Sequence, residues 1–379
     1  MKTIYLDHAA ATPVDEKVLK AMEPFFSNEF YNPSATYLAA KNISKKIENA
    51  REDIVYHLGA RTTEFIFTAG GTEANNLAIK GVMQKHPKAN VIYSAIEHES
   101  VSKSAEHFIH KIAPVNEDGL INLEKLEKLI DDHTVLISIM YANNEIGSVQ
   151  PLNKISKLIS EIRKTRLQKN INTPLLLHSD ACQTPSYLDL HVSSLGVDLM
   201  TLNSGKIYGP KQFGGLYVNR NVQLVSQIDG GGQESGIRSG TENPASIVGF
   251  AKALSLVQSN KKEESDRLSS IQAFFFGEIK RAIPDIIING SLTNRLPNNL
   301  HVTIPNQDNE LMLMKLDELG IQCASGSACN ASSDELSQTL IAIGQSENQI
   351  RSSLRFTMGK STSINDIEYL IQSLQKIIQ

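Results

Sequence analysis

The sequence has few cysteines, and their scarcity limits the chemistry open to it. Only Cys182, Cys323 and Cys329 occur in 379 residues. An odd, small number in a long chain argues against a disulfide framework, and the lack of a Cys-x-x-Cys pair argues against a structural zinc site. A cysteine with neither role is usually a small buried hydrophobic residue, unless its surroundings indicate otherwise.

Long apolar runs are also absent. No stretch approaches the roughly 20 apolar residues of a membrane-spanning helix. The N-terminal segment MKTIYLDHAAATP lacks the apolar core of a secretory signal, because Asp7 and His8 interrupt it. The formal net charge of -4 provides no positive surface for nucleic acid or anionic lipid. We therefore expect a cytoplasmic protein that binds neither nucleic acid nor membranes directly.

Short β-rich runs alternate with amphipathic helical runs through the first two thirds of the chain. The predicted strands are 64–68, 90–94, 135–140, 175–178 and 199–202, and helices are predicted from 72 onward, over 123–130 and over 155–165. This order predicts an α/β fold with a mostly parallel sheet covered by helices. In such sheets ligands bind at the carboxyl ends of the strands.

A polar, charged segment, 259–266, marks a change of pattern inside what we interpret as one long helix. A helix, a strand at 300–304, another helix, a small-residue loop and two further helices follow. We therefore predict a large domain over 14–260 and a smaller α+β domain formed by 1–13 and 261–379.

The segment Thr68-Ala69-Gly70-Gly71-Thr72 runs from a predicted strand into a predicted helix. Glycines let the backbone approach a ligand closely, and the free N–H groups and positive end of a helix favour phosphate. The spacing is not that of a Walker A loop. The alternative is an ordinary strand–turn–helix in which Thr72 caps the helix.

Asp180 follows a buried strand in the segment HSDACQ. Taken alone, it is most simply a helix-capping residue. A carboxylate in this place would also suit the protonated nitrogen of a pyridine ring, which then becomes a stronger electron sink.

Lys206 stands between a strand and a Gly-Pro turn in NSGKIYGPK. A lysine there is usually a solvated surface residue. If it faces a desolvated site, its amine could form a Schiff base.

Cys329 lies within SGSACNASS, a run of small polar residues that offers little to pack against. An accessible thiol of this kind is a candidate nucleophile where its thiolate is favoured. The alternative is a solvent-facing loop cysteine without a role. Cys182, directly after a strand, fits a core residue instead.

In their order and spacing these motifs resemble the group I cysteine desulfurases of the NifS/IscS type, within the fold-type I pyridoxal-phosphate enzymes. The resemblance extends over essentially the whole chain, and the SGSAC form fits group I. The matching segments are YLDHAAATP (5–13), NPSA (32–35), FTAGGTEANNLAIKG (67–81), SAIEHES (94–100), NNEIGSVQP (143–151), HSDACQ (178–183), KIYGPK (206–211), GGGQESGIRSGTEN (230–243), SGSAC (325–329) and SLRFTMG (353–359).

The resemblance implies a role for each matching residue. Lys206 would bind pyridoxal 5'-phosphate covalently, Asp180 would pair with its ring nitrogen, and Gln183 would contact its ring hydroxyl. His98 would stack on the ring and take part in proton transfer. The phosphate would be held by Gly71, Thr72, Ser204 and, from a neighbouring subunit of a homodimer, Thr241.

The substrate residues are assigned in the same way. Arg355 would bind the carboxylate of L-cysteine, since its planar guanidinium suits a bidentate contact, and Asn144 would lie beside the ring and near the substrate. Cys329 would be the nucleophile that takes the sulfur as a persulfide. Arg355 could instead form a plain ion pair at a strand end, and Asn144 could be a turn-former, with Asn143 making the contact.

Three departures from the family pattern stand out. Gly205 replaces the histidine that usually precedes the Schiff-base lysine, from which we hypothesise a weaker hold on the cofactor. The segment 31–37 loses a glycine and a histidine, and Ser235 replaces an arginine. Cys323, also unusual, could form a disulfide or accept sulfur, but we interpret it as a small buried residue at a strand end.

Two other functions remain open at this point: a selenocysteine lyase, and a weakly active docking platform for sulfur-acceptor proteins. The retained Lys206, Asp180, His98, Cys329 and Arg355 argue against the platform. The sulfur acceptor itself, whether an iron–sulfur scaffold or a protein of tRNA thiolation, is not indicated by any motif.

Overall fold

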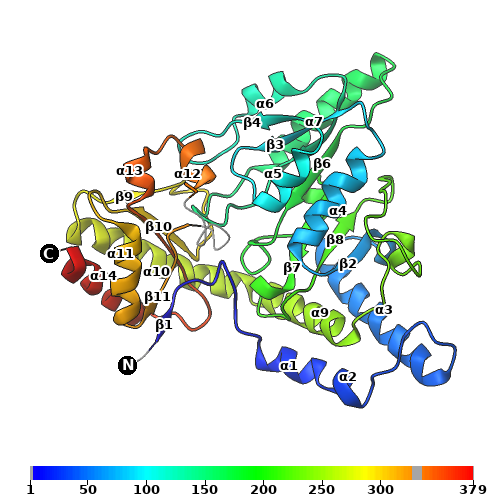
Figure 1. Cartoon of the computed structure of the whole chain (residues 1–379), viewed down its shortest axis with the longest axis horizontal. Coiled ribbons are helices and arrows are strands. Elements are labelled where there is room, and N and C mark those ends of the chain that lie inside the picture. Colours follow the sequence, from blue (N-terminus) through cyan, green and yellow to red (C-terminus); the bar gives the residue numbers. More distant parts are fainter. Residues whose placement is uncertain (1–2, 327–334, 379) are drawn as a thin grey trace.

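A computed structural model describes residues 3–326 and 335–378. At its centre is a seven-stranded sheet with strand order β2-β8-β7-β6-β5-β3-β4 (Figure 1). The strands are β2 (Phe65–Thr68), β3 (Asn90–Ser94), β4 (Ile109–Ala113), β5 (Thr134–Ser138), β6 (Leu176–Asp180), β7 (Leu199–Asn203) and β8 (Gly214–Val218). Only β8 runs antiparallel to its neighbours, β2 and β7. The expected α/β fold with a mostly parallel sheet is confirmed.

Helices cover both faces of this sheet because its strands are apolar on both faces. Val91 and Ile92 are adjacent in β3, yet they belong to different hydrophobic clusters. One cluster packs α4 (Gly71–Met83) and α5 (Glu99–Ala105) on the sheet. The other cluster includes residues of α1 (Glu16–Met22), α3 (Leu38–Leu58), α6 (Leu123–Leu129), α7 (Leu152–Gln168), α8 (Val192–Leu195) and α9 (Pro244–Ser259). The short α2 (Pro24–Ser27) follows α1.

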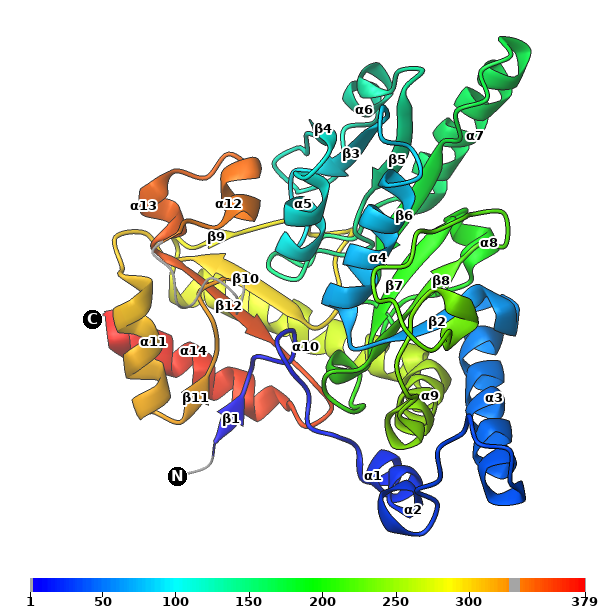
Figure 2. The same ribbon diagram turned by 45° about the vertical axis from the view of Figure 1, so that its right-hand side comes forward.

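A second, smaller sheet has the order β12-β10-β9 and lies beside the first (Figure 2). Its antiparallel strands are β9 (Ile287–Ile288), β10 (Asn299–Thr303) and β12 (Ser353–Thr357). The N-terminal strand β1 (Ile4–Tyr5) pairs in parallel with β11 (Ile321–Gln322). The helices of this part are α10 (Lys261–Ala282), α11 (Asn309–Glu318), α12 (Gln338–Ala342), α13 (Glu347–Ile350) and α14 (Ile364–Ile378). A separate hydrophobic cluster joins the small sheet to α10, α11 and α14.

The interpretation of 259–266 as part of one long helix is wrong. Helix α9 ends at Ser259 and α10 begins at Lys261, with Asn260 between them at φ -102° and ψ 5°. Asparagine favours such breaks, because its side chain competes for backbone hydrogen bonds. The domain boundary at 260/261 coincides with this break and stays a prediction. In the part of the chain that the structure describes, no helix is long and apolar enough to cross a membrane.

The small sheet has an apolar face and a polar face, and both are buried. Leu300, Val302, Leu354 and Phe356 belong to the hydrophobic cluster. The alternate residues form what we call the polar sheet face: Asn299, His301, Thr303, Ser353, Arg355 and Thr357, each at most 2% exposed. Polar side chains buried this deeply need partners within the protein, so this face depends on a hydrogen-bond network.

His301 lies directly opposite Arg355 in the register of β10 and β12. Asn289 donates from Nδ2 to His301 Nδ1 at 3.0 Å and to Thr303 Oγ1 at 2.8 Å. Burial, reinforced by the charges of Arg295 and Arg355, lowers the pKa of His301 to about 3. The imidazole is therefore neutral in the folded protein across the physiological range.

A second buried contact fixes the loop that precedes α9. Arg51 on α3 donates to both carboxylate oxygens of Glu234 at 2.9 Å, and Glu234 also accepts the backbone N–H of Phe67 at 2.8 Å. Glu234 and Ser235 have φ values of 46° and 58°. Such left-handed conformations cost a non-glycine residue roughly 1–3 kcal/mol, so the ion pair offsets local strain.

We expect Glu234→Ala to destabilise the protein by about 3–5 kcal/mol, because it leaves Arg51 buried without its carboxylate. The matched control is Glu48→Ala. Glu48 also contacts Arg51, at 3.3 Å, but its side chain is 54% exposed, so its loss should cost under about 1 kcal/mol. Urea unfolding of both variants measures the difference, and equal midpoints would contradict a structural role for the buried pair.

We expect His301→Asn to reduce the amount of folding stability that the protein loses as the pH falls. With a pKa near 3 when folded and near 6.5 when unfolded, His301 binds more protons in the unfolded chain between these values. Its contribution is complete above pH 6.5 and declines as the pH falls, by up to about 1.4 kcal/mol per pH unit. Urea unfolding from pH 7.5 to 4.5 should show the wild type losing stability faster than the variant. Exposed His110→Asn is the control, and parallel wild-type and His301→Asn curves would refute a neutral His301.

Candidate active site

The predicted site residues come together at the carboxyl ends of the strands of the large sheet. β6 ends at Asp180, and β7 leads into a 3-10 turn, Ser204–Lys206. The charges of Lys206 and Asp180 both act on His98 and on the thiol of Cys182. These four side chains therefore share one volume, at the edge where parallel sheets bind ligands.

Asp180 is only 6% exposed and has several hydrogen-bond donors. Its Oδ1 accepts the backbone N–H of Cys182 at 2.9 Å, and its Oδ2 accepts from Asn75 Nδ2 at 2.7 Å. Burial alone would raise the pKa of this carboxyl, but Cys182, His98 and Asn75 together lower it below its ordinary value. Asp180 is thus held as a carboxylate.

The start of α4 forms a small cradle. Gly70 has φ 123°, which L-residues rarely adopt. A Cβ built on Gly71 would lie 2.8 Å from Cys182 Sγ and 3.4 Å from Asn203 Nδ2, so only glycine fits comfortably. The first N–H groups of a helix have no partner within it, and Thr72, which is exposed, belongs to this first turn.

The amide of Asn203, to which no sequence motif assigned a role, also borders this cradle. Ser204 lies differently: its Oγ is buried without a hydrogen-bond partner among the described residues, and a Cβ on Gly209 would meet it at 2.1 Å. Gln183 donates to the carbonyl of Ala9 at 3.0 Å. Thr241 is exposed on the loop before α9 and lines a separate cavity of about 170 Å³.

His98 is the N-cap residue of α5 and is half-buried. Its Nδ1 lies 3.1 Å from the backbone N of Ser100 and 2.8 Å from Ser100 Oγ. Burial, reinforced by Lys206, lowers the pKa of His98, while Asp180 and Glu99 oppose the shift. A cavity of about 550 Å³ is lined by His98 and Asn144, together with the buried carboxyl of Glu97.

The structure separates the roles of the two adjacent asparagines. Asn143 is the turn-former: its Oδ1 accepts from the backbone N–H groups of Glu145 and Ile146, both at 2.9 Å. This turn holds Asn144 at the cavity. The Asn144 carbonyl also accepts from Arg355 Nη1 at 3.2 Å.

Arg355 extends from the polar sheet face toward the large sheet. It is 1% exposed, and its Nη2 donates to Asp7 Oδ1 at 2.7 Å. It therefore lies at the junction of the N-terminal segment, the small sheet and the turn that carries Asn144. An ion pair does exist here, as the plainer interpretation expects, but it is deeply buried beside the other site residues.

The three cysteines differ in setting. Cys182 is a buried core residue, and burial raises the pKa of its thiol well above the usual range. Cys323 follows β11 and is half-buried, and burial, helped by Asp7, raises its pKa to about 12. Cys329 lies outside the described residues.

These residues fit pyridoxal 5'-phosphate, the cofactor that the resemblance implies. The cradle at Gly71 would take the phosphate, since a helix N-terminus favours an anion. The Asp180 carboxylate would face the ring nitrogen, and Lys206 supplies the amine. Among His/Cys/Asp/Glu side chains of the described ranges, no group of three is arranged to hold a metal ion.

Comparison with known proteins identifies the family. Residues 4–370 match the family model Aminotransferase class-V. Cysteine desulfurase IscS of Dictyoglomus turgidum is 38% identical over 386 residues, which cover 100% of this chain and 95% of the relative. A solved NifS-like protein superimposes with a TM-score of 0.90 at 29% identity, covering 100% of this chain and 99% of the other. A structure described as SspA in complex with cysteine has a TM-score of 0.80 at 34% identity, covering 94% and 99%.

These matches extend over both sheets and every site residue that the structure describes. The chain therefore belongs to the class-V aminotransferase family and, within it, to the cysteine desulfurases of the NifS/IscS type.

Proposed function

We propose that the chain converts L-cysteine to L-alanine with pyridoxal 5'-phosphate and keeps the sulfur as a persulfide on Cys329. The observation that carries this proposal is the convergence of Lys206, Asp180 and His98 beside the cradle at Gly71. Cysteine as the substrate is supported by the relatives named cysteine desulfurase and by the related structure with bound cysteine.

The bound cofactor supplies an electron sink that stabilises negative charge at the α-carbon of the amino acid. The amine of Lys206 would hold the cofactor and would also be the base that accepts the α-proton of the substrate. Asp180 would keep the ring nitrogen protonated, because its own carboxyl stays ionised in the buried site. Gly71 and Thr72, with Ser204 and a partner's Thr241, are the proposed phosphate contacts, and Gln183 is the proposed contact of the ring hydroxyl.

Arg355 is the proposed receptor for the substrate carboxylate. Its guanidinium donates to Asp7 and to the Asn144 carbonyl, and these two contacts fix its orientation. A buried, pre-oriented cation loses little entropy when it binds an anion. Asn144 lies at the adjoining cavity, in reach of the same substrate.

Cys329 is the proposed sulfur acceptor. Its thiolate attacks the substrate sulfur, so that a new S–S bond forms as the Cβ–S bond breaks and its electron pair returns to the carbon skeleton. The high pKa values of Cys182 and Cys323 disfavour the thiolate that this step needs. The persulfide would then pass to an iron–sulfur scaffold or a tRNA-thiolation protein in the cytoplasm.

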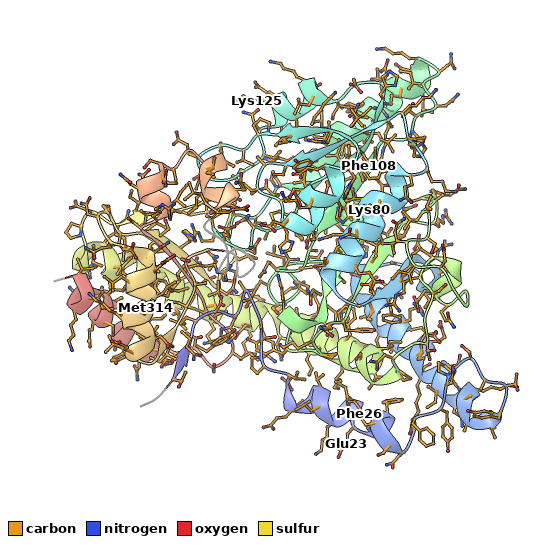
Figure 3. The ribbon with its side chains drawn as sticks, in the orientation of Figure 1. Glu23, Phe26, Lys80, Phe108, Lys125 and Met314 are labelled. Atoms are coloured by element: carbon orange, nitrogen blue, oxygen red, sulfur yellow. The ribbon has the colours of Figure 1, made fainter. Side chains whose placement is uncertain are left out.

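We also propose a homodimer. A cluster of apolar side chains, from α2 to the first residue of α3, is exposed: Phe26 68%, Phe30 66%, Tyr37 52% and Leu38 75%. Phe30 stacks on Tyr31 at 4.7 Å, and Tyr31 contacts Tyr37. Figure 3 shows the side chain of Phe26 on the α1–α2 segment at one edge of the molecule. Exposed patches of this kind mark protein–protein contacts.

The first experiment measures alanine formed from L-cysteine by the protein with added cofactor and a reductant. We expect Cys329→Ala and Lys206→Ala to lower the rate by at least roughly a hundredfold, because each lacks a reacting group. Cys323→Ser is the matched control and should retain activity, since its thiol is not ionised.

Other outcomes would contradict this assignment. Alanine from Cys329→Ala at the wild-type rate would exclude Cys329 as the acceptor. Release from selenocysteine but not cysteine would indicate a selenocysteine lyase. No alanine from the wild type, even with excess cofactor, would favour a docking platform.

We expect the protein to sediment as a dimer, and Phe30→Asp combined with Leu38→Asp to shift it toward monomer, because charges would replace buried apolar contacts. Leu167→Asp is the control, because Leu167 is 76% exposed at the distant end of α7. Sedimentation velocity over a concentration series gives the masses. A dimer that survives the double substitution would exclude this patch as the interface.

A further inference from the structure

A chain of hydrogen bonds connects Asp180 to His98. Asn75, on α4 and 1% exposed, uses its side-chain NH2 group twice. It donates to Asp180 Oδ2 at 2.7 Å and to Ser100 Oγ at 2.8 Å. An amide NH2 group has two hydrogens, so both are used, and Ser100 Oγ is an acceptor in this contact.

The hydroxyl hydrogen of Ser100 is then available to His98. Ser100 Oγ lies 2.8 Å from His98 Nδ1, and the backbone N–H of Ser100 donates to the same nitrogen at 3.1 Å. The backbone group can only donate. A hydrogen on Nδ1 would point at this N–H group, so Nδ1 accepts, and the neutral ring carries its hydrogen on Nε2.

We propose that Ser100 and Asn75 are positioning residues that hold His98 as the neutral Nε2–H tautomer and tie its ring to Asp180. They act through His98 and Asp180 and do not touch the reacting atoms themselves. The two residues come from different helices, α4 and α5, so the contact also fixes these helices to each other at the site.

The mechanistic consequence rests on the proposed function. With its hydrogen on Nε2 and its lone pair at Nδ1 engaged, His98 has an N–H donor and no nitrogen left to act as a base. It can stack on the ring and donate a hydrogen bond, but it cannot accept the α-proton in this state. That task then belongs to Lys206. The part expected of His98 in proton transfer is then limited to donating the hydrogen on Nε2.

The electrostatics of the site agree with a neutral ring. Lys206, Asp180 and Glu99 are among the charged groups that act on His98. Burial and the cation of Lys206 lower the pKa of His98, and the two carboxylates oppose this. Donors that point at Nδ1 add a preference for the neutral form.

The test uses the holoenzyme labelled with nitrogen-15 histidine, with His98→Gln to assign the His98 signals. Nitrogen–proton correlation spectra against pH give both the tautomer and the pKa of His98. We expect an unprotonated Nδ1 and a protonated Nε2 in the wild type at neutral pH. A charged ring, or a hydrogen on Nδ1, would overturn the proposal.

Substitutions separate positioning from general stability. In Ser100→Ala one donor to Nδ1 is lost, so the pKa of His98 should rise by roughly one unit, a tenfold change in proton affinity. Ser100→Thr should restore it. Ser104→Ala is the control, because the Ser104 hydroxyl is buried in the same helix but donates only to the Ser100 carbonyl. Identical His98 pKa values in Ser100→Ala and Ser104→Ala would refute the role of the hydroxyl.

Asn75 has a matched control in its neighbour Asn76, whose Nδ2 donates to the Thr72 carbonyl and to no other group of the described residues. Asn75→Ala should shift the His98 pKa and also the pH dependence of the cofactor's visible absorption, because Asp180 loses a donor. Asn76→Ala should change neither, and equal behaviour of the two variants would refute the connection.

The kinetic readout distinguishes this inference from the proposed function. Ser100→Ala should lower kcat roughly tenfold and leave KM for cysteine within about twofold, as expected when one orienting hydrogen bond is lost. A wild type that shows the Nε2–H tautomer but forms no alanine would refute the proposed function alone and support the positioning role.

Discussion

Asp180 carries a negative charge at a position only 6% exposed to solvent. A charge so buried must be stabilised by hydrogen-bond donors or be neutralised, and here the surrounding residues supply the donors. The backbone N–H of Cys182 and the amide of Asn75 both donate to the carboxylate. Because Asn75 belongs to α4 and Cys182 follows β6, satisfying one charge also sets the helix that carries the cradle against the strand that carries the acid.

The same requirement extends outward through neutral groups. The side-chain NH2 group of Asn75 has a second hydrogen, which it donates to Ser100 Oγ. Ser100 in turn orients His98, the first residue before α5. Placement of the ring therefore follows from the charge on Asp180 through two side chains. This arrangement puts an uncharged donor near Lys206, which is half-buried and beside which a second cation would be costly.

Arg355 is the opposite case, a buried cation that joins distant parts of the chain. Its partners are Asp7, near the N-terminus, and the carbonyl of Asn144 in the large sheet region. Across the small sheet it faces His301, which burial and the nearby arginines keep neutral. A protonated His301 would compete with Arg355 for negative charge. With His301 neutral, Arg355 is the one charged side chain of the polar sheet face.

The sequence predicted the parts of this structure that depend on local pattern. Strand 90–94 matches β3, and strand 199–202 differs from β7 by one residue. β4 was missed because charged and polar residues interrupt its edge strand (IHKIA), and β8 because it begins with two glycines (GGLYV). Glycine is needed at both positions, because a Cβ on Gly214 would lie 2.4 Å from the Leu202 carbonyl and one on Gly215 would lie 2.2 Å from the Phe65 ring.

The site residues divide along the same line. Asp180, Lys206 and His98 were predicted because each lies in a short segment that matches the family in residue order and spacing. Asn75, Asn203 and His301 were missed, since their importance comes from contacts between residues far apart in the sequence, as for Asn75 with Asp180, 105 positions away. Ser100 left a local signal, because a residue two positions after a helix N-cap commonly donates its N–H to the capping side chain.

The departure at Gly205 shows how packing changes the interpretation of a single substitution. A Cβ at this position would lie 3.3 Å from Lys211 Cδ and 3.4 Å from Asn203 Oδ1. Lys211 donates to the carbonyls of Thr12 and Gly205, so its amine stays beside the turn that carries Lys206. The turn therefore loses the donor of a histidine but keeps a cation close by. Asn203, which caps Gly205 N with its Oδ1, presents its amide to the cradle at Gly71. If the phosphate is held more weakly, the reason would be that the neutral amide of Asn203 serves where the family has a charge-capable histidine. The cradle would still have a donor.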